Sequence, residues 1–191
     1  GARKSIDFIT MASTGDSSDF GELIQERFDF SGGMGNGVRA VFAGGYKQTS
    51  PAATFYKIID TVNVQSTGNA TKFGELSATR GRTANTSNST RGLNLGGGPA
   101  PDGRTNIIEF ITLSTEGNSQ DFGDLLAPVL SLAACSSSTR AVQPGSAPSP
   151  GAVNTIQYVT IATTGNAVDF GDMTVAQNGA SSISDVNGGL G

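Results

Sequence analysis

The chain has 191 residues, a net charge of −4, one cysteine and no histidine. Because its few Lys and Arg residues are scattered, it lacks the basic footprint of a nucleic-acid or anionic-membrane surface. A single Cys excludes an intrachain disulfide, and the lack of His excludes a Ser-His-Asp triad and imidazole metal sites. No apolar run is long enough to span a bilayer, so membrane insertion is not expected.

An 18-residue stretch occurs four times and sets the organisation of the chain. In each copy, a Gly follows the first Ile by nine residues. The Phe of a Phe-Gly pair then follows that Gly by five residues. A repeat of roughly 50 residues indicates a solenoid, a propeller or another array of similar units. Residues 1–191 are therefore predicted to form a single repeat domain. Its hairpins are expected at 6–23, 59–76, 108–125 and 156–173.

Each copy is predicted to begin with a β-strand that is covered, at least in part, on both faces. In the fourth copy, Ile156 to Ile161, apolar residues fall at positions one, three, four and six instead of alternating strictly. Gly followed by Asn or Asp then predicts a primed hairpin turn, and the second strand is expected to end at Phe-Gly. The predicted structural anchors of the hairpins are Gly15, Gly68, Gly117, Gly165, Phe20, Phe73, Phe122 and Phe170.

A second, weaker repeat lies between the hairpins. A short apolar strand opens with Arg39, Arg91 or Arg140, and in its two best copies it ends in Gly-Gly, which predicts a sharp turn. Since acids also recur with the repeat, each Arg is expected to bridge to an acid of a neighbouring unit, and not to line a central channel. The segment Leu125–Ala134 contains Pro128 and is predicted to be strand and loop, not helix. Each unit would then supply three or four strands.

These motifs resemble two groups of known repeats. Arg39–Gly45, followed by a loop, an Ile-x-Tyr strand and an aromatic residue, resembles a kelch-type β-propeller repeat in which Phe replaces the usual Trp. The sequence TIQYVTIATTGNAVDFGDM (Thr155–Met173) more closely resembles repeats in virion proteins of tailed bacteriophages. The first resemblance implies a kelch-like β-propeller. Since the composition favours an all-β chain and the repeat occurs four times, we predict four short blades. The second resemblance implies a structural component of a virion.

The two ends of the chain allow two arrangements of these blades. A strand near Asn187–Gly191 could pair with the N-terminal segment and close a four-bladed ring, which is the arrangement we predict. The alternative is an open array, or part of a larger ring that closes with other subunits.

No catalytic, cofactor-binding or metal-binding residue is predicted. Acids such as Asp121 and Asp169 recur at the same repeat position, which is typical of turn capping and solvated rims. The predicted function is that of a non-enzymatic virion structural protein, either a capsid-decorating subunit or a tail appendage. Its expected partners are other virion subunits in an oligomeric assembly, and a host-surface glycan. The alternatives are a soluble carbohydrate-binding propeller lectin and a carboxylate glycosidase.

Overall fold

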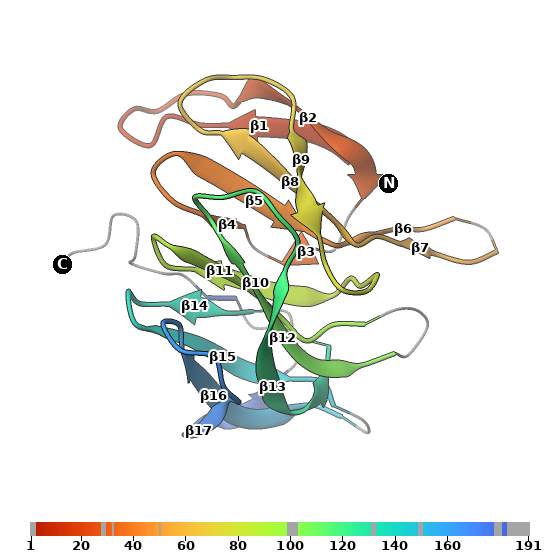
Figure 1. Ribbon diagram of the computed structural model, residues 1–191, viewed down its shortest axis with the longest axis vertical. Helices are drawn as coiled ribbons and strands as arrows, with labels where there is room; N and C mark the ends of the chain where they lie inside the picture. Colours follow the sequence, from red (N-terminus) through yellow and green to blue (C-terminus); the bar gives the residue numbers. More distant parts are fainter. Residues whose placement is uncertain are drawn as a thin grey trace.

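The computed structural model describes residues 3–27, 30–31, 33–49, 51–98, 103–130, 133–148, 151–177 and 181–182. Within these residues the chain is all-β, with seventeen strands (Figure 1). The same residues include no helix that is long and apolar enough to cross a membrane. The strands form several antiparallel sheets that succeed one another along the chain.

Three of these sheets share a core of four strands, in which each strand pairs with its neighbour in an antiparallel way. The second sheet consists of β4 (Met34–Gly35), β5 (Arg39–Ala43), β8 (Ile58–Asn63) and β9 (Thr71–Glu75). The third sheet consists of β10 (Thr83–Ser87), β11 (Arg91–Leu95), β12 (Thr105–Thr112) and β13 (Gln120–Val129). The fourth sheet consists of β14 (Cys135–Ser136), β15 (Arg140–Ser146), β16 (Val153–Thr160) and β17 (Val168–Gln177).

The remaining strands are fewer and shorter. The first hairpin pairs β1 (Arg3–Phe8) with β2 (Ser18–Arg27). A second hairpin, β6 (Tyr46–Lys47) with β7 (Thr54–Phe55), protrudes between β5 and β8 (Figure 1). Strand β3 (Phe30–Ser31) runs parallel to the start of β10 and so adds a fifth strand to the third sheet.

The sequence repeat and the strand order correspond closely. The Ile segments form β1, β8, β12 and β16, the Phe segments form β2, β9, β13 and β17, and the Arg segments form β5, β11 and β15. Strands β8 and β12 are buried on both faces in their central residues, as predicted, and β16 is partly buried. The prediction is wrong for β1, most of whose residues are exposed. Strand β13 continues through Pro128 to Val129, which confirms strand in place of helix there.

Two details of the predicted hairpins are wrong. The tight turn comes before the Gly-Asn pair, because Ser13 N donates to Thr10 O (3.3 Å) and Thr163 N donates to Thr160 O (3.3 Å). The second strand does not end at Phe-Gly either, since Phe20 lies near the start of β2 and that strand continues to Arg27. The Gly-Asn pair is instead used for contact with the neighbouring sheet, as described below.

Sharp turns end two of the Arg strands as predicted. After β5, Gly44 and Gly45 have φ angles of 68° and 96°, and after β11, Gly96 and Gly97 have φ angles of 60° and 78°. These left-handed conformations strain residues with a side chain, which explains the Gly-Gly pair at this position.

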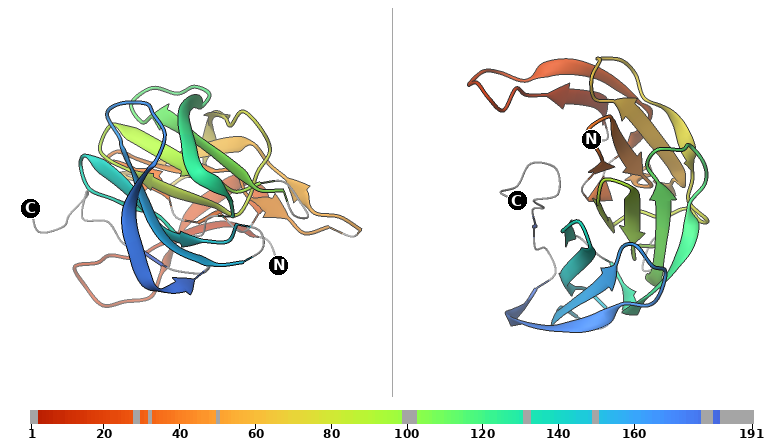
Figure 2. Two further views of the ribbon diagram at one scale, coloured as in Figure 1. Left: turned by 90° about the horizontal axis from the view of Figure 1, so that it is seen from below. Right: turned by 60° about the vertical axis from the view of Figure 1, so that its left-hand side comes forward.

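The sheets succeed one another around an open arc, with the first hairpin at one end and the fourth sheet at the other (Figure 2). No sheet is closed, and the predicted four-bladed ring is not confirmed. The segment 187–191, which was expected to close the ring, lies outside the described residues.

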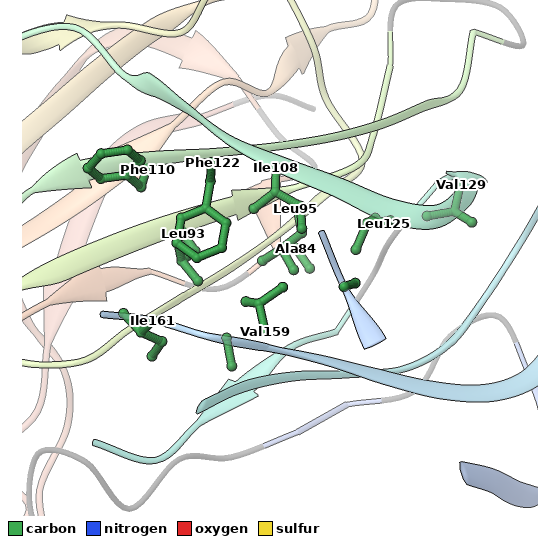
Figure 3. Packing of buried hydrophobic residues seen from close by; sticks show 12 residues of the cluster. Ala84, Leu93, Leu95, Ile108, Phe110, Phe122, Leu125, Val129, Val159 and Ile161 are labelled. Atoms are coloured by element: carbon green, nitrogen blue, oxygen red, sulfur yellow. The ribbon is translucent and has the colours of Figure 1, made fainter. Parts of the chain in front are cut away.

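The hydrophobic core is divided into three clusters. In the largest, Phe122 and Leu125 of the third sheet pack with Val159 of β16 and with Ile161, which directly follows that strand (Figure 3). Residues from successive sheets share each cluster, so the stacking of sheets contributes to apolar burial in all three.

Candidate functional site: the junctions between sheets

Each repeat is joined to the next by the same three hydrogen bonds, and we call this contact a junction. Between the third and fourth sheets, Gly165 N donates to Phe122 O at 2.7 Å. Ala167 N donates to Asp124 O at 2.7 Å, and Asp124 N donates to Asn166 Oδ1 at 3.0 Å. The same bonds occur at the two earlier junctions: Gly68, Asn69 and Ala70 with Phe20 and Glu22, and Gly117, Asn118 and Ser119 with Phe73 and Glu75.

Glycine is required at the junction because two backbones approach each other closely. A Cβ atom on Gly123 would lie 2.4 Å from Gly165 O, and one on Gly74 would lie 1.9 Å from Gly117 O. The first junction repeats the contact, with a Cβ on Gly21 at 2.3 Å from Gly68 O. No side chain fits at such distances, so the glycine of each Phe-Gly pair is a steric requirement of stacking.

The phenylalanine of the Phe-Gly pair fills the space between sheets. Phe20, Phe73 and Phe122 are all buried, and the last is only 2% exposed. Phe170, at the same position of the fourth copy, is 56% exposed. Three of the four predicted Phe anchors therefore lie in the core, and the fourth lies on the uncovered face of the last sheet.

Buried ion pairs cross the first two junctions. Arg27 of the first hairpin contacts Asp60 of the second sheet at 2.9 Å, and both side chains are fully buried. Arg80, which follows the second sheet, contacts Glu109 of the third sheet at 2.7 Å. Each Arg stands seven residues after the Phe of its copy, and each acid directly follows the first Ile of the next copy.

Burial acts strongly on these charged groups. It raises the pKa of Asp60 above its usual value, although Arg27 and the Ile24 amide act in the opposite direction. It also lowers the pKa of Arg27 and of Arg80, against the attraction of their acids. For Asp60, Arg27 and Arg80, the effect of burial on the pKa is thus larger than that of the partner. Buried ion pairs commonly add little net stability because removing the charges from water is costly. We therefore interpret the pairs as selectors of which sheets stack together, not as sources of net stability.

The third junction has lost both charges together. Val129 stands at the position of the Arg, and Gln157 stands at the position of the acid. Gln157 Oε1 accepts from Leu126 N (2.9 Å), and Gln157 Nε2 donates to Gln143 Oε1 (2.7 Å). A neutral amide thus takes the place of the ion pair, and no buried charge is left without its counter-ion at this junction.

The three repeated arginines that open the Arg strands also reach toward neighbouring elements. Arg39 lies 3.7 Å from Glu116 of the next repeat, as predicted. Arg91 instead donates to the carbonyl oxygens of Ile161 (2.9 Å) and Ala162 (3.0 Å) in the next repeat. Arg140 lies over the ring of Tyr158 within its own sheet. Among the residues that the structure describes, the predicted bridge to an acid is therefore seen for Arg39 and not for Arg91 or Arg140.

Arg27, Asp60, Arg80 and Glu109 were not identified from the sequence. The available signal was the recurrence of Arg seven residues after Phe, together with an acid directly after the first Ile of the next copy. Their joint loss at Val129 and Gln157 could have strengthened that signal. The pairing of each Arg with its acid is not apparent from the sequence, because the two residues lie about 30 positions apart in different repeats.

The described acidic and thiol side chains do not come together in a site that could carry out catalysis or bind a metal. Asp19, Asp121 and Asp169 are exposed, and Asp169 Oδ1 accepts from Gly171 N (2.8 Å), which is a local turn contact. The described residues include no group of three or more Cys, Asp or Glu side chains that could hold a metal ion. Burial raises the pKa of the half-buried Cys135, which favours its protonated, less reactive form.

Two pockets occupy the same place in different repeats. One, of about 310 Å³, is lined in part by Thr61, Asn63 and Asn69. The other, of about 150 Å³, is lined in part by the corresponding Tyr158, Thr160 and Asn166. Both lie between an Ile strand and the Gly-Asn pair that follows it, and both present hydroxyl and amide groups.

Comparison with known protein families and with curated proteins finds no match. The junctions therefore have to be interpreted from their own geometry.

Proposed function

We propose that this protein is a non-enzymatic structural protein of a virion, either a capsid-decorating subunit or a tail appendage. The observation that carries the proposal is the junction, which uses the same bonds three times to attach one sheet to another. A surface built from such contacts suits protein–protein assembly, and the repeat resembles those of tailed-bacteriophage virion proteins.

We also infer that the sheets are blades of a kelch-like β-propeller. Four-stranded antiparallel sheets with consecutive strand order, stacked face to face around an arc, support this inference. The first hairpin would be the outer half of the first blade. Closure of the ring would need either the terminal segments of the chain or another subunit.

The virion assignment is tested by mass spectrometry of density-purified particles from cultures that carry the gene. The expected result is a fixed ratio of this protein to the major capsid protein across the particle fraction, with immunogold label on particles. A soluble fraction from the same culture, treated identically, is the control. Finding the protein only in cells that contain no particles would overturn the assignment.

A second candidate function is carbohydrate binding, because the two equivalent pockets offer hydroxyl and amide groups at matching positions. A glycan array probed with the purified chain tests it. Binding that is lost in Asn63→Ala and Thr160→Ala together, and retained in each single variant, would support equivalent sites, because neither side chain takes part in a junction bond. An array without signal would exclude this candidate for the glycans displayed.

A further inference from the structure

The two ends of the arc carry the two halves of a fourth junction, and we propose that these halves join two copies of the chain head to tail. The inference deepens the proposed function and rests on its assembly role. The partner is a second copy of this chain, and the contact is the one already made three times within the molecule.

The fourth sheet supplies the first half of this junction. Its Phe170, Gly171 and Asp172 repeat the Phe122-Gly123-Asp124 sequence that holds the third junction. Gly171 has a φ of 137°, close to the 143° of Gly123, so the strand already has the conformation used in stacking. Among the described residues, nothing lies within 4 Å of a Cβ placed on Gly171. This half is therefore formed but uncovered.

The first hairpin supplies the second half. Gly15, Asp16 and Ser17 correspond to the Gly-Asn-Ala and Gly-Asn-Ser triplets that bind the preceding sheet inside the molecule. Each triplet provides two backbone N–H groups and one side-chain oxygen. The carboxylate oxygen of Asp16 can accept the same hydrogen bond as the amide oxygen of Asn in the internal triplets. The docked contact would then pair Gly15 N with Phe170 O.

The apolar surfaces at the two ends also match the internal pattern. Ile9 and Met11 of the first copy are 64% and 93% exposed. Their counterparts in the third copy, Ile111 and Leu113, are 4% and 0% exposed, because the Phe of the preceding sheet packs in the same cluster. Phe170 has the side chain that would cover Ile9 and Met11.

A second copy fits this role because the two halves lie at opposite ends of the open arc (Figure 2). Joining the tail of one molecule to the head of another is a heterologous contact, which gives a closed ring when the rotation closes and a filament when it does not. Both results are built from the same junction.

Two residues make the fourth junction weaker than the others. Asp7 stands at the position of the acid of the ion pair, whereas Gln177 stands at the position of the Arg, so the carboxylate would have no counter-ion. The second residue is Asp16. The internal acceptors are neutral Asn69, Asn118 and Asn166, whereas the first hairpin has Asp16. Asp16 would bind the amide of Asp172 and would bring two carboxylates close together, which is unfavourable. Asp16→Asn restores the internal form and should therefore strengthen association.

The test is sedimentation velocity of the purified full chain over a range of concentrations. Association should increase with concentration. Asp16→Asn should lower the dissociation constant by about two- to fivefold, since like-charge repulsion of roughly 0.5–1 kcal/mol is removed. Gly171→Ala and Phe170→Ser should each raise it at least about tenfold, the first by a clash and the second by loss of the core side chain. Circular dichroism would check that each variant is folded.

The control is Leu126→Ser, which removes an exposed apolar side chain away from both ends and should leave association unchanged. Two outcomes would overturn the proposal. One is association that Gly171→Ala and Met11→Asp both leave intact. The other is a monomer at every concentration, and protection of Phe170 in that monomer would point to closure within the chain. Neither outcome concerns particle localisation, so the virion assignment stands or falls separately.

Discussion

At the scale of single residues, stacking depends on glycines that allow two backbones to touch and on charges that are buried in pairs. The Cβ distances at Gly21, Gly74 and Gly123 show that no larger residue fits at a junction. The ion pairs Arg27–Asp60 and Arg80–Glu109 add a requirement for matched charge. Both requirements can be tested separately.

We expect Glu109→Gln to destabilise the protein by about 3–5 kcal/mol, because Arg80 would stay buried without a counter-ion. The double variant Arg80→Val with Glu109→Gln copies the neutral third junction and should recover most of that loss. Urea unfolding followed by circular dichroism measures both free energies. Equal losses in the single and the double variant would contradict the selector role of the pair.

We expect Gly123→Ala to be more destabilising than Gly171→Ala by about 1–3 kcal/mol. Both glycines have a similar positive φ, so the strain of a side chain is nearly the same in the two variants. Only Gly123 faces the backbone of the next sheet. The comparison is made by thermal unfolding at a low protein concentration, and equal effects would show that the clash is relieved elsewhere.

Glu75 should make stability depend on pH on the acid side. Hydrogen bonds from Lys57, then from Lys72, lower the pKa of Glu75 to about 2, below its ordinary value of 4.5. The folded state therefore loses this contribution as the pH falls from about 4.5 toward about 2, and retains it above that window. Glu75→Gln should flatten this part of the stability curve in low salt, and a curve unchanged from that of the wild type would exclude the effect.

At the scale of elements, the turns that precede the Arg strands are closed by a side chain. Asn88 Oδ1 accepts from Thr90 N (2.9 Å) and Arg91 N (2.8 Å), while Asn88 Nδ2 donates to Ser138 O (2.9 Å) near the fourth sheet. Asn36 closes the corresponding turn of the second sheet with two bonds from Val38 and Arg39. The Asn88 turn is thus also tied to its neighbour.

Asn88→Ala should lower the free energy of unfolding by about 1–3 kcal/mol, because it leaves partly buried backbone groups without a partner. Asn36→Ala is the matched control and should cost less, since water reaches that turn and no bond from Asn36 crosses to another sheet. Chemical unfolding of both variants gives the comparison. If Asn36→Ala lowered the free energy of unfolding as much as Asn88→Ala, the bond from Asn88 to the neighbouring sheet would contribute little.

Much of the strand pattern could be predicted from the sequence, because strand residues are selected by burial and Gly-Gly pairs mark sharp turns. The role of the Gly-Asn pair could not, since local rules assign it to a primed turn of its own hairpin. In the structure it binds Phe-Gly of the preceding copy, more than 40 residues earlier. The Arg–acid pairs were missed for the same reason, because their partners are distant in sequence.

At the scale of the whole molecule, stability should be unequal along the arc. The third sheet has a neighbour on both sides, whereas the first hairpin and β17 each have an uncovered face (Figure 2). In repeat architectures each unit depends on its neighbours, so the end units open most easily.

We expect native-state hydrogen exchange in dilute solution to be slowest in β11 and β12 and fastest in β1 and β17. A difference in protection of at least about 100-fold is expected between the central and terminal strands. The measurement would be repeated at high protein concentration. Uniform protection along the chain in dilute solution would contradict unequal stability.

The loss of both charges at Val129 and Gln157 has a genetic consequence. Repeats that look alike should recombine freely, yet moving the fourth repeat to follow the first hairpin would bury Arg27 opposite an amide. Moving the third repeat to follow β13 would bury Glu109 against Val129 in the same way. Unequal crossing-over within the gene would thus yield chains that fold poorly, and the present order of the copies would be maintained by selection.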